Sequence, residues 1–364
     1  MKRLSLVLIA IILVSALILT GCASTPAPSQ PAPAPKTPTP APAPAGPITL
    51  KFAFDMPKTG AIVPGWEWFA SELQKQSNGK VKVEFYGAAA LFTQKDTPDS
   101  LKAGVADIAN VSLSSHSQFF PLNFIFTLAG MEFPDLTREG FIAKYKAYIE
   151  LAQKYPALSK ELADYKLLFW CPNPGYRLIS KPKIVVPDDL KGIKVGSSAA
   201  QGQVTKLAGG VWVQAVPNDS YEGINKGVVD GSWVTWAQIS VYKLDEVASN
   251  FLDTGITQES QQVCMNLKTW NSLPADIQKL IGDLTLETIG RSSDGQITAG
   301  AKGINNAKTR NRTITTPTPE QRAQWDKLTA PIAEEWVKNA QSKGMANATD
   351  FLKDFRALQA AAMK

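Results

Sequence analysis

The folded part of the chain alternates between strand-like and helix-like segments. Residues 48–54 alternate apolar and polar positions as a strand does, residues 66–73 place apolar side chains at helical spacing, and residues 81–85 alternate again. A helix over about residues 96–104 and an apolar strand over residues 107–113 continue the series. Chains with this alternation form a sheet whose faces are covered by helices, so we predict an α/β fold.

The same alternation returns in the second half of the chain, which predicts two α/β lobes of similar design. The expected strands cover residues 165–170, 193–195, 211–216 and 228–234, and the expected helices cover residues 199–207 and 220–226. Ligands of open α/β sheets bind beyond the carboxyl ends of the strands. The candidate binding loops are therefore those that follow Phe54, Leu113, Trp170, Val195 and Val234.

The C-terminal third of the chain is expected to be helical. Residues 273–310 contain no proline after their second position and predict one long helix that could brace both lobes. Gly290 and Gly303 are the points at which this helix could break. Residues 319–363 predict two amphipathic helices separated near Gly344.

The N-terminus has the layout of an export signal. Two basic residues precede an apolar run over residues 4–19, and the run ends in Leu19-Thr20-Gly21-Cys22. This pattern is typical of a secretory signal with a lipid attachment site. An uncleaved membrane helix is the alternative, but the run is close to the lower limit of the ~20 residues that span a bilayer. We predict a lipoprotein signal peptide over residues 1–21, lipid attachment at Cys22, and a periplasmic or otherwise extracytoplasmic location on the membrane.

A linker is expected between the anchor and the folded part. Residues 22–47 are rich in proline and alanine, with serine and threonine but almost no large apolar side chain. Such a segment cannot bury enough surface to fold and favours polyproline II. At about 3.1 Å per residue it could hold the folded part up to roughly 75 Å from the bilayer.

Several kinds of function are disfavoured by composition. The formal net charge is +6, but lysine and arginine do not cluster, which is a poor case for nucleic-acid binding. We find no phosphate-binding loop and no G-x-G-x-x-G between a strand and a helix, so no cofactor is expected. The single histidine, His116, excludes the usual multi-histidine metal sites.

A catalytic site is also not expected. Ser114, Ser115 and His116 are adjacent and could be taken for a hydrolase site. Adjacent strand residues point to opposite faces, and the chain lacks a G-x-S-x-G nucleophile elbow. The other interpretation is a polar loop that hydrogen-bonds a ligand or water, and we therefore predict a protein that is not an enzyme.

Two cysteines remain after Cys22. Outside the cytoplasm a disulfide between Cys171 and Cys264 is permitted. Both residues lie in strand-like apolar runs, where a buried thiol is equally ordinary. The sequence leaves both alternatives open.

Several short motifs follow one another in a fixed order. They are Asn78-Gly79-Lys80, GVAD at 104–107, Gly175-Tyr176-Arg177, Ser180-Lys181-Pro182, PDDLKGIKV at 187–195, KGVVDG at 226–231 and NLKTWNSLP at 266–274. In this order and spacing, residues 48–364 resemble the substrate-binding component of tripartite ATP-independent periplasmic (TRAP) transporters, the DctP-like family.

The resemblance implies a two-lobed fold like that of periplasmic binding proteins, with a ligand cleft between the lobes and a long helix spanning both. Lobe I would comprise residues 48–174 and 259–300, and lobe II residues 175–258 and 301–364. A monomer of this kind would close on a small organic acid and dock onto small and large integral membrane subunits.

The same resemblance directs attention to individual ligand residues. In many members an arginine follows the equivalent of Lys194-Val195 and forms a two-pronged ion pair with the ligand carboxylate. Here that position is Gly196, and Val234 replaces a polar residue that follows the Asp-Gly pair. Arg177 matches an auxiliary arginine that would either bind an anion or form a salt bridge inside the second lobe. The ligand could therefore be a less polar or aromatic acid, or an uncharged molecule.

Tryptophans could supply a surface for such a ligand. Trp233 and Trp236, with Trp66 from the opposite lobe, could stack on a planar molecule, or they could belong to the core. The full set of candidate ligand-binding residues is Arg177, Trp233, Trp236, Ser114, Ser115, His116, Asp55, Trp66, Gly196 and Ser197.

The function that fits best is the extracytoplasmic solute-binding subunit of a TRAP-type secondary transporter that works by hinge closure. One alternative is a sensory lipoprotein that presents its ligand state to a signalling receptor. The other is an exported hydrolase, which the missing nucleophile elbow disfavours.

Overall fold

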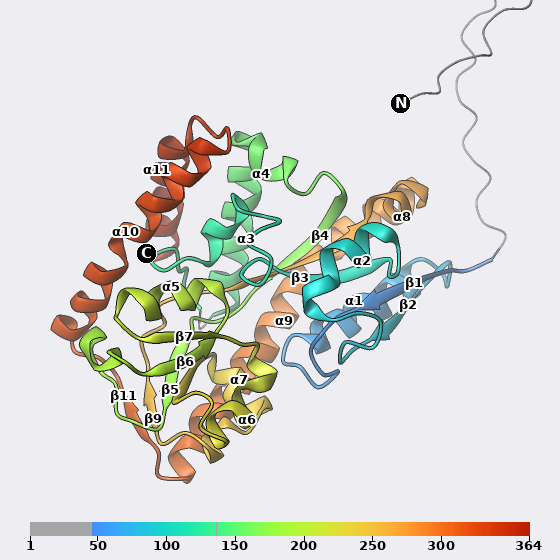
Figure 1. Cartoon of the computed structure of the whole chain (residues 1–364). Coiled ribbons are helices and arrows are strands. Elements are labelled where there is room, and N and C mark those ends of the chain that lie inside the picture. Colours follow the sequence, from blue (N-terminus) through green and yellow to red (C-terminus); the bar gives the residue numbers. More distant parts are fainter. Residues whose placement is uncertain (1–45, 136) are drawn as a thin grey trace, which may run out of the picture. The chain divides into compact units, whose positions relative to one another are not determined.

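Two β-sheets organise the fold (Figure 1). The computed structural model describes residues 46–135 and 137–364, which belong to one compact unit. The first sheet has the strand order β2-β1-β3-β10-β4 and the second has the order β11-β9-β5-β8-β6-β7. Together with a long helix that contacts elements of both sheets, this confirms the predicted two-lobed α/β architecture.

The strands of each sheet are mostly short. The first sheet contains β1 (Ile48–Ala53), β2 (Val81–Tyr86), β3 (Ile108–Ser112), β4 (Tyr165–Pro172) and β10 (Ser260–Asn266). The second contains β5 (Arg177–Ser180), β6 (Lys194–Ser197), β7 (Val211–Gln214), β8 (Gly231–Val234), β9 (Asn250–Leu252) and β11 (Thr313–Thr315). Strand β1 is parallel to β2 and β3, and β6 is parallel to β7 and β8, as expected where helices connect the strands.

Helices connect and cover these strands (Figure 1). Those before residue 210 are α1 (Val63–Gln76), α2 (Thr97–Ala103), α3 (Arg138–Lys154), α4 (Pro156–Lys160) and α5 (Ala199–Leu207). Those after it are α6 (Ser220–Asn225), α7 (Trp236–Val241), α8 (Leu267–Ser272), α9 (Ala275–Thr309), α10 (Pro319–Ser342) and α11 (Ala348–Ala362). The last two confirm the helix pair expected on either side of Gly344.

Helix α9 runs unbroken for 35 residues and packs against α1 and, further along its length, against α7. The glycines at which a break was considered have a packing role instead. A Cβ at Gly303 would lie 2.1 Å from the carbonyl oxygen of Trp236, and one at Gly290 would lie 2.0 Å from Nε of Arg138. A third glycine, Gly295, has the same role, because a Cβ there would lie 2.0 Å from the carbonyl oxygen of Ala61. Glycine therefore lets the neighbouring backbone come close to the helix at two points.

Besides the passage through α9, the chain crosses between the sheets through two short segments that lie side by side. Residues 173–176 lead from β4 to β5, and residues 253–259 lead from β9 to β10. The backbone N–H of Asn173 donates to the carbonyl of Glu259 over 2.8 Å, and that of Tyr176 donates to Thr257 over 2.7 Å. These paired crossings are the natural place for one sheet to turn relative to the other.

The C-terminal helices touch both sides of the fold. Trp325 of α10 donates its indole N–H to the carbonyl of Val185 over 2.9 Å, and Trp336 donates to that of Pro121 over 3.1 Å. Helix α11 packs against α3. The division into lobes at residues 174, 258 and 300 stays a prediction.

Cys171 and Cys264 do not form a disulfide with each other. Both Cys171 and Cys264 are buried free thiols. On the paired strands β4 and β10, Cys171 lies opposite Gln261 and Cys264 lies opposite Leu167. Cys171 packs into the core on the α1 side of the sheet and Cys264 into the core on the other side, so the two thiols point away from each other.

A buried lysine braces the second crossing. Lys144 of α3 is fully buried, and its ammonium nitrogen donates to the backbone and side-chain oxygens of Gln258, each over 2.9 Å. The Gln258 side chain also accepts from the backbone N–H of Phe133 over 2.9 Å. Burial lowers the pKa of Lys144 to about 7.

Replacing Lys144 with methionine should remove a pH dependence of stability. Above about pH 7 the native lysine is neutral, whereas the unfolded chain keeps its proton up to a pKa of about 10.4. The unfolded state then binds more protons, so the free energy of unfolding rises with pH in this window, by up to about 1.4 kcal/mol per pH unit. Urea unfolding at about pH 7 and about pH 9 measures this rise. The wild-type chain should show it and Lys144→Met should lack it; an equal rise in both would contradict the assignment.

Candidate functional site

A small cavity lies where strand ends of both sheets meet. From the first sheet its lining includes Asp55, Ser115, Asn173, Glu259 and Gln261. From the second it includes Ser198, residues 216–218 and the α7 residues Ala237, Gln238 and Val241. We call this space, with a volume of about 70 Å³, the inner cavity.

The topology explains why these residues converge. Asp55 comes just after β1, Ser115 just after β3 and Ser198 just after β6. These strands point their carboxyl ends toward the crossing segments, and ligands of α/β sheets bind at such ends. Four of the five loops that the sequence placed at strand ends contribute to the lining, and after Val234 the lining comes from α7.

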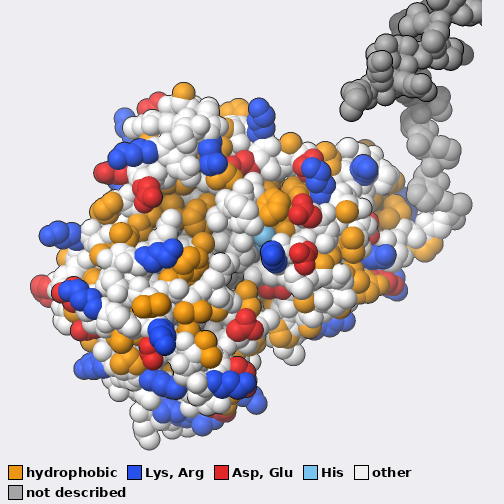
Figure 2. Space-filling model, viewed as in Figure 1, with side chains coloured by type: hydrophobic (Ala, Val, Ile, Leu, Met, Phe, Trp, Pro, Cys, Tyr) orange, Lys and Arg blue, Asp and Glu red, His pale blue; other side chains and the backbone are white. Residues whose placement is uncertain are grey.

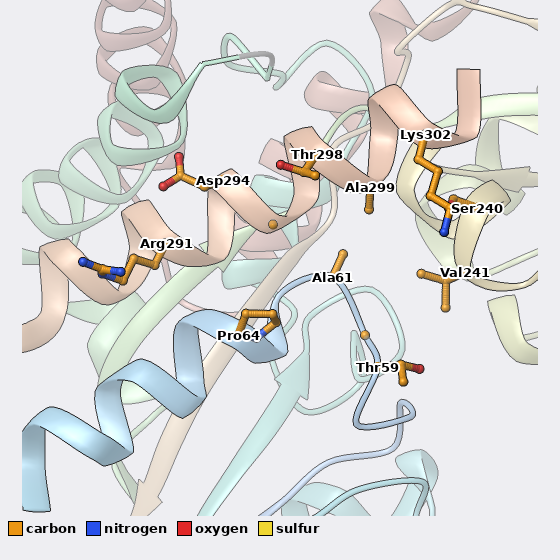
Figure 3. A pocket seen from close by; sticks show the side chains of 12 residues that line it. Thr59, Ala61, Pro64, Ser240, Val241, Arg291, Asp294, Thr298, Ala299 and Lys302 are labelled. Atoms are coloured by element: carbon orange, nitrogen blue, oxygen red, sulfur yellow. The ribbon is translucent and has the colours of Figure 1, made fainter. Parts of the chain in front are cut away.

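A wider groove adjoins the inner cavity. It has a volume of about 660 Å³ and shares Gly60, Ala61 and Val241 with the cavity. Figure 3 shows α9 lying opposite the loop before α1 and the end of α7, with Lys302 on the α7 side. This outer groove is larger, but it is not where the strand ends converge, so we take the inner cavity as the candidate binding site.

Asp55 is held by amide groups. The Gln94 side-chain amide donates to Asp55 Oδ2 over 2.9 Å, and that of Asn110 donates to Oδ1 over 3.5 Å. The Ser115 hydroxyl in turn donates to Gln94 Oε1 over 3.1 Å. Burial raises the pKa of Asp55 above its usual range, and its hydrogen bonds act in the opposite direction.

His116 is fully buried and lies behind Gln94. Its Nδ1 is 2.8 Å from the carbonyl oxygen of Ser112 and its Nε2 is 2.6 Å from that of Gln94. Burial lowers the pKa of His116, and the two carbonyl contacts act against this shift. Because both ring nitrogens are occupied by backbone oxygens, the ring is not placed to take a proton from a serine, which argues against the hydrolase alternative.

Glu259 supplies a second carboxyl group. Its Oε2 accepts from the Tyr176 hydroxyl over 2.5 Å, and its Oε1 accepts from the Ser112 hydroxyl. Burial raises the pKa of Glu259, and these hydroxyl contacts lower it. The contact with Tyr176 links the cavity to the first crossing segment.

Side-chain amides complete the polar lining. Gln296 of α9 donates to Asn173 Oδ1 over 2.7 Å. Gln261 is 7% exposed, and its side-chain oxygen finds no hydrogen-bond donor among the described residues. A buried acceptor without a donor is costly, so it marks a place where a bound molecule could donate.

Arg177 lies apart from the cavity lining. It is 6% exposed, and its guanidinium bonds Asp253 over 2.8 Å, Asp135 over 3.1 Å and the carbonyl of Gly175. The Arg177–Asp253 pair corresponds to the salt bridge inside the second lobe that the sequence offered as the alternative to anion binding, whereas Asp135 belongs to the predicted lobe I. The ligand role of Arg177 stays a prediction.

The candidate tryptophans lie in the core of the described structure. Trp66 packs against Phe52 and Phe54, and Trp233 donates to the Thr205 hydroxyl over 3.0 Å. Trp236 stacks on Phe251 with ring centroids 6.0 Å apart and donates to Asp253 over 3.2 Å. None of the three lines the inner cavity, although Trp236 is next to Ala237, which does.

The remaining candidates lie beside the cavity. Gly196 is buried in β6, where a Cβ would meet Ala215 at 3.4 Å, and the Ser197 hydroxyl donates to the carbonyl of Ser198 over 3.1 Å. Ser114 joins the two sides, because its hydroxyl donates to that of Ser198 over 2.9 Å and accepts from the Ala200 N–H over 3.2 Å. Of the ten candidates, Asp55 and Ser115 line the cavity.

Sequence reasoning missed most of the polar lining. Glu259 directly precedes β10, Gln261 is its second residue, and Asn173 follows β4. Polar residues where an apolar strand begins or ends were the available signal. Gln94, Gln238 and Gln296 come from a short 3-10 helix and two α-helices and carry no comparable signal.

Some expectations concern other parts of the chain or other kinds of site. Cys22 and the signal peptide lie outside the described residues. Within residues 46–135 and 137–364, none of the helices has the length and apolar character that crossing a membrane requires. The same residues bring no three His, Cys, Asp or Glu side chains together as a metal site.

Comparison with known proteins places this geometry in a family. The model of bacterial extracellular solute-binding protein family 7 matches residues 56–339. The C4-dicarboxylate-binding periplasmic protein DctP of Rhodobacter capsulatus is 24% identical over 308 residues, which cover 83% of this chain and 90% of that protein.

Solved structures share the fold. A TRAP periplasmic solute-binding protein from Desulfovibrio salexigens has a TM-score of 0.74 and 25% identity, covering 86% of this chain and 95% of that one. A TRAP solute-binding protein from Rhodoferax ferrireducens, in complex with copurified benzoate, has a TM-score of 0.78 and 22% identity, covering 87% and 98%. The predicted resemblance is confirmed at the level of the family, whose members bind solutes and are not enzymes. The chain therefore belongs to the bacterial extracellular solute-binding proteins of family 7, the DctP family of TRAP transporters.

Proposed function

We propose that this chain is the extracytoplasmic solute-binding subunit of a TRAP-type transporter and captures a small organic solute in the inner cavity. The observation that carries the proposal is the lining itself, which comes from strand ends of both sheets. A solute bound there touches both sides of the fold. It can therefore stabilise a closed arrangement that the empty protein populates less.

The crossing segments provide the hinge for this closure. Residues 173–176 and 253–259 are hydrogen-bonded to each other, so they can turn together. Such a turn would move Asp55 and Ser115 relative to Ser198. The Ser114–Ser198 hydroxyl contact would form and break with the same motion.

The relatives point to organic acids as a starting class of ligand. Their names include C4-dicarboxylates and benzoate. In this chain Arg177 is engaged by two aspartates, and Gly196 stands where many members carry an arginine. A small organic acid or a related solute that is less polar or aromatic fits this site better than a dicarboxylate does.

The N-terminal segment would place this binding unit at the membrane. A lipid on Cys22 and the proline-rich residues 23–47 would tether the folded part outside the cytoplasm. From there the closed form would dock onto the small and large membrane subunits of the transporter. The face shown in Figure 2 carries interspersed acidic and basic side chains, which offers no extended basic surface for nucleic acid.

A dye pair across the cavity tests the proposal. Lys95 and Asp219 are exposed, and each is next to a residue of the cavity lining, Gln94 or Asn218. In a chain that carries Cys22→Ser, cysteines introduced at positions 95 and 219 can be labelled with a donor and an acceptor dye. Cys171 and Cys264 should not react, because burial raises their thiol pKa values to about 11 and about 12. A library of aliphatic and aromatic acids, amides and phenols is then screened for energy transfer and for melting temperature.

The same solute should raise the melting temperature and the energy transfer together. A control pair at Lys191 and Lys226, both exposed on the second-sheet side, should not respond. Stabilisation by solutes with no change in energy transfer would contradict closure.

Arg177→Met separates a structural role from a ligand role. Removing the guanidinium leaves Asp135 and Asp253 without their partner, so the free energy of unfolding should fall by about 3 kcal/mol. Arg291→Met is the matched control, because its salt bridge is exposed and worth about 0–1 kcal/mol. Urea unfolding measures both variants. If Arg177→Met kept its stability but lost about tenfold or more in solute affinity, Arg177 would be a ligand residue.

A further inference from the structure

We infer that the solute presents a hydrogen-bond-donating nitrogen group, a protonated amine or amidine, to Asp55 and Gln261 in the inner cavity. This inference rests on the proposed function, because it names the chemistry of the solute taken by that same site. An acid group, where the solute has one, then lies outside the inner cavity.

The charges of the lining favour a donor. Asp55 and Glu259 contribute two carboxyl groups to one small cavity. Among the described residues that line it, none is lysine or arginine. A carboxylate entering this space would meet two acids and no formal positive charge, whereas a cation would be attracted by both.

Three buried basic side chains near the cavity are engaged by other groups, whereas Arg291 and Lys302 line the outer groove. His116 faces the backbone oxygens of Ser112 and Gln94, and Lys144 donates to Gln258. Arg177 is paired with Asp135 and Asp253. None of these three side chains lines the cavity, so they do not offer a carboxylate the paired hydrogen bonds that it needs.

The side-chain oxygen of Gln261 also favours a solute that donates a hydrogen bond. The Gln261 side-chain oxygen is buried and has no donor among the described residues. Gln261 is the second residue of β10, Glu259 directly precedes that strand, and both line the inner cavity. A nitrogen donor from the solute would satisfy this oxygen, whereas a carboxylate would add another acceptor beside it.

Asp55 contributes a charge to the cavity and not an empty acceptor. Gln94 and Asn110 each donate an amide N–H to one of its oxygens, and the backbone N–H groups of Asp55 and Met56 also bond the carboxylate, so a cation would be attracted by its charge. Neutral groups such as Asn218 and Gln238 could donate to a carboxylate, but they do not offset the two acids. The cavity lining therefore favours a solute group that donates hydrogen bonds.

Three probes with one ring and different head groups test the inference. Benzamidine is cationic, benzamide is a neutral donor and benzoate is an anion. Their affinities for the full chain, purified in detergent at about pH 7.5, are measured by calorimetry and by melting temperature. Benzamidine should bind at least about tenfold more tightly than benzoate, with benzamide between them. Tighter binding of benzoate, or no response to either nitrogen probe, would overturn the inference.

Two variants locate the binding. Asp55→Asn and Gln261→Met should each weaken benzamidine binding by about tenfold or more. Gln261→Met removes a buried acceptor that lacks a donor, so the melting temperature of its empty form should equal or exceed that of the wild type. Asp188→Asn, at an exposed aspartate, is the matched control and should bind as the wild type does. Unchanged binding in both cavity variants would place the probe elsewhere and overturn the inference.

The dye pair separates this inference from the proposed function. If carboxylates alone raise the energy transfer, the protein closes on solutes and only the nitrogen-donor inference fails. If no solute in the library raises it, the proposed closure fails as well.

Discussion

The pairing of the two crossing segments is the constraint on which the rest of the structure depends. The backbone bonds from Asn173 to Glu259 and from Tyr176 to Thr257 fix how the sheets are joined. The same short stretch provides Asn173 and Glu259 to the cavity, and Gln258 to the buried Lys144. The proposed hinge, the contact with Lys144 and part of the cavity lining thus come from adjacent residues, so a substitution in one would affect the others.

The architecture could be predicted because it follows from periodicity. Apolar alternation located β1, β2 and β3 to within a residue or two, and the uninterrupted run after Pro274 predicted α9. The rule that ligands bind beyond strand ends then selected the loops that line the cavity. Asp55 and Ser115 were predicted in this way, because a strand end fixes where the next residues lie.

The individual partners of side chains could not be predicted. From the sequence, Trp66 and Trp233 could equally stack on a ligand or belong to the core. Only their packing in the structure, against Phe52 and Trp325 respectively, shows that they belong to the core. Arg177 could not be assigned for the same reason, because Asp135 and Asp253 are distant along the chain. Gln94 and Gln296 reach the cavity from helices whose polar residues usually face water.

The close backbone approaches on α9 bear on how far the protein can open. The loop before α1 touches the helix at Gly295, and the start of α7 touches it at Gly303. If both contacts persist while the sheets separate, the stretch between them has to bend, and it is only about two helical turns long. Bending of this short stretch of α9 would cost elastic energy. That cost would limit how far the two sheets can separate and would favour their return.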